Sequence, residues 1–247
     1  MIRALAIASL AALVGCASRP APPPARPAEG PLLAVGPALP AAGSIADGEA
    51  FPRGPGTTRW LAARGSDPTV AEAVAVEVTV RPAAGHGASF ARDIPGESTD
   101  WLSAGPEGTE LHAVLSPADA ALSIFATPLR LLPATLPAGA EHRASAAMEV
   151  VEADDPARRK DRGTGERIAR YAHDAEITVA GRTLRARVLE STFTARLRSA
   201  TATRTTELFV VPGLGPVAER WKREVLVLGL VRTVREGVRV RDLSDLE

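Results

Sequence analysis

Cys16 is the one cysteine of this 247-residue chain, and its thiol offers the most reactive chemistry of the N-terminal region. An ionised thiol is a nucleophile that can be alkylated, acylated or oxidised. Cys16 follows Arg3, a stretch over residues 4–14 that is apolar except for Ser9, and Gly15. This arrangement is typical of a secretory signal. The stretch is shorter than the roughly 18 to 20 residues that a membrane-spanning helix needs.

The run Leu13-Val14-Gly15-Cys16 resembles the lipobox of bacterial lipoproteins. In that family the thiol receives a diacylglycerol, the signal is cleaved before the cysteine, and the new amino group is acylated. The resemblance implies that Cys16 is lipidated and anchors the chain to a membrane, since two or three acyl chains give lasting attachment. Ala17 and Ser18 follow the cysteine, which in Gram-negative lipoproteins favours the periplasmic face of the outer membrane.

The other reactive side chains form no recognisable catalytic or metal-binding set. His86, His112, His142 and His173 are isolated in the sequence, without the spacing of a zinc site. His173 and Asp174 are neighbours, but adjacent residues of a strand face opposite ways, so we expect a surface pair and not a dyad. The sequence therefore predicts no enzyme, no metal and no cofactor.

The composition argues against a nucleic-acid partner. Lys and Arg together number 29, as do Asp and Glu, and aromatic residues make up only 4% of the chain. Neither a basic excess nor a set of stacking aromatics is available for nucleic acid.

The lipobox resemblance and the composition together predict three segments. Residues 1–15 are the signal, and residues 16–42 are the lipidated Cys16 followed by a Pro/Ala-rich linker. Proline at this density excludes helix and ladder pairing and favours an extended spacer. Residues 43–247 form one β-rich periplasmic domain.

Period-two alternation dominates that domain. Residues 74–80 alternate valine with other residues, and residues 176–179 and 183–190 flank an Ala180-Gly181-Arg182 hairpin turn. Residues 166–173 suit either a helix or the start of a long strand, and residues 117–121 one helical turn. Further strands are expected at 86–92, 109–115, 122–126, 144–151, 203–211, 217–228 and 230–240, with turns at 85, 105–108, 212–213, 229 and 236–237. The pattern predicts a mainly β fold, an antiparallel meander that forms a curved sheet or open half-barrel with few short helices.

Two stretches, residues 128–139 and residues 175–217 with their Pro212-Gly213-Leu214-Gly215 ending, resemble bacterial envelope proteins of unknown function. These proteins are broadly similar to the half-barrels of LolB- and LppX-like lipoproteins. The resemblance implies a repeated curved sheet and supplies no catalytic residues. From the residues alone, the Pro-Gly segment is expected to be a turn.

Two functions remain open. The first is a non-catalytic binding module whose concave face holds a lipid or another apolar ligand, with valine, leucine, alanine and tryptophan lining the cavity. Trp60, Trp101 and Trp221 could line it, although packing in the core is favoured. The alternative is a structural or assembly factor that docks an envelope protein complex through an exposed sheet edge or the basic loop at residues 158–162. That alternative predicts a filled core and an unprotected edge.

Overall fold

A computed structural model describes residues 31–63 and 73–244 of the chain. These residues are mainly antiparallel β-structure, as the alternation predicts. Their helical elements are α1 (Asp47–Ala50) and the single turn η1 (Pro117–Asp119). The signal, Cys16 and the linker as far as residue 30 lie outside the described residues.

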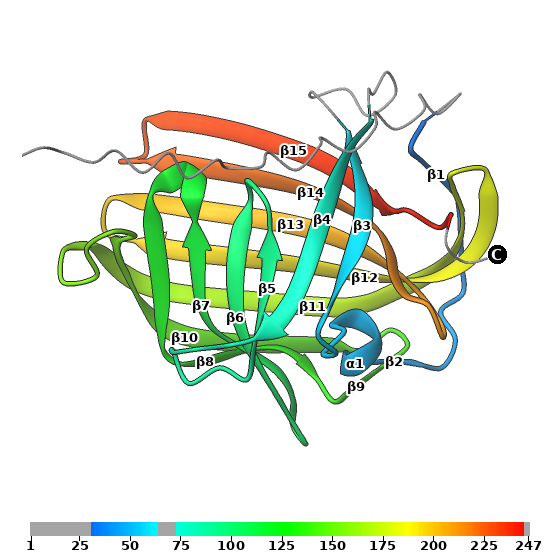
Figure 1. Ribbon diagram of the computed structural model, residues 1–247, viewed down its shortest axis with the longest axis horizontal. Helices are drawn as coiled ribbons and strands as arrows, with labels where there is room; N and C mark the ends of the chain where they lie inside the picture. Colours follow the sequence, from blue (N-terminus) through cyan, green and yellow to red (C-terminus); the bar gives the residue numbers. More distant parts are fainter. Residues whose placement is uncertain (1–30, 64–72, 245–247) are drawn as a thin grey trace, which may run out of the picture.

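The strands close into a barrel (Figure 1), so the predicted curved sheet or open half-barrel is wrong. Within the described residues twelve strands follow one another around the wall, and pairing of β11 with β12 joins the two ends of the sheet. In order, they are β11 (Arg159–Val179), β10 (Glu141–Glu152), β8 (Ala121–Pro133), β7 (Gly108–Ser116), β6 (Ser98–Gly105), β5 (Phe90–Ile94), β4 (Ala73–Pro82), β3 (Gly56–Ala63), β15 (Val231–Arg241), β14 (Gly215–Val227), β13 (Ala200–Val211) and β12 (Arg182–Leu197). Alternation of apolar and polar residues predicts which face of a strand is buried, but it does not predict which element packs against that face. Here the opposite wall of the same sheet covers it.

Most of the predicted strands lie within longer observed ones. Residues 74–80 belong to β4, and residues 166–173 are strand within β11. Ala180 and Gly181 both have positive φ in the β11–β12 turn, as a two-residue hairpin loop requires. The predicted turn at 236–237 is wrong, because Gly237 lies inside β15 and leaves room for the indole ring of Trp221.

Three short strands and α1 complete the fold. β1 (Leu33–Leu39) pairs with the end of β11 although it lies in the Pro/Ala-rich segment, where ladder pairing was not expected. Its register shifts between Val35 and Ala38, around Pro37, and proline is tolerated at such a bulge. β2 (Ser44–Ala46) pairs with β9 (Thr135–Pro137), and both lie near α1 at one end of the barrel (Figure 1).

The wall separates the two largest hydrophobic cores of the described residues. In β12, Val188 belongs to one core and Leu189 to the other, and in β13 the same holds for Phe209 and Val210. Because successive side chains of a strand point to opposite faces, the two cores lie on opposite sides of the sheet. Leu189 and Val210 belong to the interior core, to which most of the barrel strands contribute. The second core lies outside the wall and includes Leu32 near the start of the described residues.

Candidate functional site

A belt of buried and half-buried ion pairs crosses the barrel interior. Arg239 of β15 donates through Nε to Glu219 of β14 at 3.0 Å, and a second nitrogen donates to the same carboxylate. Arg239 also donates to Glu97 at 3.0 Å. Arg204 of β13 contacts these same two carboxylates, Glu97 at 2.7 Å and Glu219 at 3.1 Å. Two arginines thus share two carboxylates inside the wall.

Aromatic rings pack on the cations of this interior. The distances from guanidinium carbon to ring centre are 5.7 Å for Arg239 and Trp60, 5.0 Å for Arg204 and Trp221, and 5.8 Å for Arg92 and Phe51. Such distances are those of cation–π contacts. Arg92 in addition forms an ion pair with Asp100 at 2.6 Å. Trp60 and Trp221 therefore contact charged groups, which is not the lining expected of an apolar ligand cavity.

The electrostatics keep this interior charged. Burial alone would raise the pKa of Glu219, but Arg239, Arg204 and Arg92 together lower that pKa to about 2. Arg167 donates from Nε to the carbonyl of Leu131 at 3.0 Å. Burial, with repulsion from Arg92 and Arg204, lowers the pKa of Arg167 to about 10, so it remains protonated at neutral pH.

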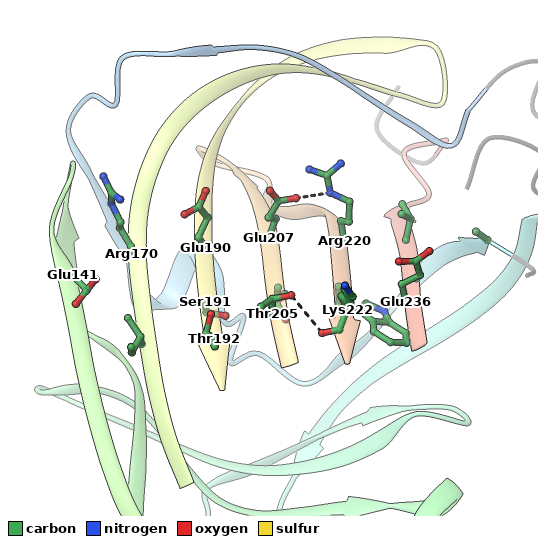
Figure 2. Close-up of a pocket in the computed structure, with 16 residues that line it drawn as sticks. Glu141, Arg170, Glu190, Ser191, Thr192, Thr205, Glu207, Arg220, Lys222 and Glu236 are labelled. Carbon is green, nitrogen blue, oxygen red and sulfur yellow. Dashed lines mark hydrogen bonds and ion pairs between the residues drawn. The ribbon is translucent and has the colours of Figure 1, made fainter. Parts of the chain in front are cut away.

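A groove of about 660 Å3 lies on the outer face of the wall, across β10 to β15. One row of charged side chains runs along it on successive strands (Figure 2): Glu141, Arg170, Glu190, Glu207 and Arg220. Arg220 donates from Nε to Glu207 at 2.5 Å. The next row holds Ile168, Thr192, Thr205, Lys222 and Glu236. Because most of this lining is charged or hydroxylic, the groove suits a polar chain better than an apolar ligand.

The β14–β15 hairpin exposes large apolar side chains. Leu230 is 85% exposed and Leu228 is 71% exposed. We call the exposed set the apolar tip, and its members are Leu226, Val227, Leu228, Leu230, Val231 and Val234. Its turn is held in place by hydrogen bonds from the Leu228 amide to the Ser199 carbonyl at 2.8 Å and from the Leu230 amide to the Val227 carbonyl at 2.9 Å. An exposed apolar patch with polar neighbours is typical of an interaction surface.

Within the described residues, one edge of the same hairpin has no strand beside it for most of its length. β15 pairs with β14 along its length, but with β3 only through Arg239, Val240 and Arg241. Within the described residues, Val231–Val238 therefore has a paired side and an open side, and we call this stretch the free edge. The open side of a strand presents unpaired backbone N–H and C=O groups, which another strand can satisfy.

The structure brings His112 close to His86, whose backbone it contacts, but it does not gather the histidines into one site. His112 bonds Ser103 at 2.7 Å, His86 packs edge-on against Trp101, and His142 lies apart beside Arg130. Burial lowers the pKa of both His112 and His142. No group of three or more His, Cys, Asp or Glu residues that could hold a metal ion occurs among the described residues.

Asp174 is buried, and the expected surface pair with His173 is wrong for this residue. Asp174 accepts a hydrogen bond from the Tyr171 hydroxyl and forms an ion pair with Arg185 at 3.0 Å. A bulge between Tyr171 and His173 interrupts the alternation. The bulge explains why a simple strand pattern misplaced this carboxylate.

The basic segment at residues 158–162 forms pairs within the chain. Arg158 contacts Glu152 at 3.2 Å and Arg159 contacts Glu149 at 2.7 Å. Lys160 donates to the carbonyls of Asp119 and Ala120 at 3.2 and 2.9 Å. Residues 159–162 belong to β11, so only the start of this segment is a loop.

The anchor residue Cys16 lies outside the described residues. None of the described helices has the length and apolar character to cross a membrane.

Sequence reasoning missed the apolar tip and the interior belt. A signal for the tip was present: Val225, Leu226, Val227, Leu228, Leu230 and Val231 are consecutive apolar residues around Gly229, where a half-buried hairpin would alternate. The belt left no comparable signal, because its members come from distant positions in the chain.

Comparisons with protein-family models, with curated proteins and with solved structures find no match to this chain.

Proposed function

We propose that this chain is a lipid-anchored, non-catalytic docking protein of the bacterial envelope, which contacts a partner protein through the β14–β15 hairpin. The observation that carries the proposal is the contrast between a barrel interior occupied by side chains and a hairpin with exposed leucines and an open edge. Stable proteins rarely expose such patches without an interaction to make.

The docking role fits the described residues better than the carriage of an apolar ligand. A carrier would need an apolar concavity, with tryptophans in its wall. Trp60 and Trp221 instead pack on Arg239 and Arg204, inside a belt of ion pairs. The outer groove is lined mainly by charged and hydroxylic side chains.

The membrane location of the proposal rests on the lipobox resemblance at Cys16. Lipidation there would hold the barrel at the periplasmic face of the outer membrane. The partner would then be a protein of the same envelope, within reach of the anchored barrel.

Site-specific photo-cross-linking in intact cells tests the docking role. A photoreactive residue at Leu230 is expected to give a discrete protein adduct. The same residue at Glu107, which has an exposed side chain in another turn of the barrel, is the matched control. The Leu230 adduct should disappear when Leu228→Asp is added, while the melting temperature of the barrel stays the same. Equal adducts at both positions, or none at Leu230, would overturn the proposal.

A further inference from the structure

We propose that the free edge of β15 pairs with the same edge of a second copy of this chain, antiparallel about a two-fold axis at Val234. This inference deepens the proposed docking role and rests on it. Six consecutive residues, from Val231 to Glu236, are exposed, and within the described residues their open side has no strand partner. Antiparallel pairing of two such edges would satisfy their unpaired backbone groups.

The side chains of the free edge favour one register. Arg232, Val234 and Glu236 are alternate residues, so they lie on one face, which is the outer face of the wall. An axis at Val234 places each Arg232 opposite Glu236 of the other copy, and the two Val234 side chains opposite each other. Opposite charges directly across an antiparallel pair are stabilising. An axis at Arg235 would instead oppose two arginines.

The charged groups of this edge are available for such contacts. Glu236 forms no ion pair with a described residue, although Lys222 lies opposite it on β14. One terminal nitrogen of Arg232 donates a hydrogen bond to the Glu224 carboxylate at 2.8 Å. Because a guanidinium has five N–H donors, Arg232 can bind a second carboxylate at the same time.

The residues of the free edge also indicate which partner binds there. On the outer face of the edge, the apolar Val234 lies between the cationic Arg232 and the anionic Glu236. The edge is therefore complementary to a second copy of itself, as an isologous two-fold contact requires. A bilayer offers no hydrogen-bond partners to a row of backbone groups. The edge is short, so the contact belongs to the small, weak class of interfaces. Anchoring of both copies in one membrane would raise their effective concentration.

Disulfide trapping in the full-length protein, in its own membrane, tests the inference. Residues directly opposite in an antiparallel pair have Cα atoms about 4.5 to 5.5 Å apart, which suits a disulfide. Under a mild oxidant, Val234→Cys should therefore give a covalent dimer. Thr201 is exposed on the outer face of β13, a strand with a neighbour on each side, so Thr201→Cys is the matched control. The parent chain controls for disulfides formed by Cys16.

Charge exchange tests the register. In the Val234→Cys background, Arg232→Glu alone or Glu236→Arg alone should lower the dimer yield about tenfold, since each change opposes like charges twice. The double variant R232E/E236R should restore the yield. Thermal melting of each variant against the parent excludes a general folding defect.

A dimer yield at Val234→Cys no higher than at Thr201→Cys would overturn the inference, as would failure of the charge exchange to restore the yield. A disulfide from Val234→Cys to a different protein would also overturn it, because another strand would then occupy the edge. The docking role has its own test at Leu230. A specific adduct there, without a Val234 dimer, would preserve the role and remove the second copy as the partner.

Discussion

Glu219 and Arg220 are consecutive residues of β14, and their environments differ completely. Glu219 points inward to Arg239, and the two side chains are 9% and 7% exposed. Arg220 points outward to Glu207, and these side chains are 52% and 31% exposed. The chemistry of the two pairs is the same. The inner pair belongs to the structure of the barrel, because Arg239 is also one of the three residues that join β15 to β3. The outer pair and its neighbours remain free to meet a partner.

The largest expected effect is the loss of the inner carboxylate. Glu219→Ala would leave the buried Arg239 and the half-buried Arg204 with one carboxylate fewer. The change should cost about 3 to 5 kcal/mol in the free energy of unfolding. Glu207→Ala, the outer counterpart, should cost about 0 to 1 kcal/mol. Urea denaturation of both variants measures the difference. Equal losses would contradict the distinction between inner and outer pairs.

The pH dependence of stability sharpens the same distinction. The folded-state pKa of Glu219, about 2, is below its ordinary value of 4.5. Its ionised form therefore stabilises the fold fully above pH 4.5, and this stabilisation is lost as the pH falls toward 2. The loss should be about 3 kcal/mol for this one group. Unfolding free energies across this pH range should fall more steeply for the wild-type protein than for Glu219→Gln, and parallel curves would count against the prediction.

A filled interior should resist added volume. A Cβ at Gly165 would lie 2.8 Å from the ring of Phe125 and 3.1 Å from the ring of Phe193. Gly165→Ala should therefore cost about 1 to 3 kcal/mol through overpacking. A Cβ at Gly54 would meet no atom within 4 Å, so Gly54→Ala is the control and should change stability by less than about 0.5 kcal/mol. A neutral Gly165→Ala would indicate empty space inside the barrel.

The smallest effect on stability is expected at the apolar tip. Leu228→Ser and Leu230→Ser remove exposed apolar surface and should change the unfolding free energy by less than about 0.5 kcal/mol. Leu228→Ser should also abolish the adduct formed by the photoreactive residue at position 230. Thermal melting beside the cross-linking yield separates the two effects, and a large loss of stability would show that these leucines are structural.

The sequence predicted individual strands and turns better than it predicted the closure of the sheet into a barrel. Alternation located β4, and turn chemistry located the β11–β12 loop, because both depend on neighbouring residues. The pairing of β3 with β15, which includes Trp60 and Arg241, brings together residues far apart in the chain. This pairing consists of only three residue pairs. No local pattern predicts such a contact, which is why a curved or half-open sheet was expected.

Individual residues show the same limit within the candidate site. Gly237 was expected to mark a turn, but it accommodates the ring of Trp221 inside a strand. The strand expected at residues 217–228 contained both Glu219 and Arg220, without distinguishing a structural group from a surface group. The apolar tip was readable in principle, because its residues are consecutive and do not alternate.

The central claim is that this protein acts through its outer surface and not by carrying a ligand inside the barrel. Native mass spectrometry with lipid extraction tests it most directly, on residues 17–247 exported behind a cleavable signal and purified without detergent. The account predicts the mass of the bare chain, with no lipid in the extract. A stoichiometric lipid released on denaturation would contradict the account and support the carrier.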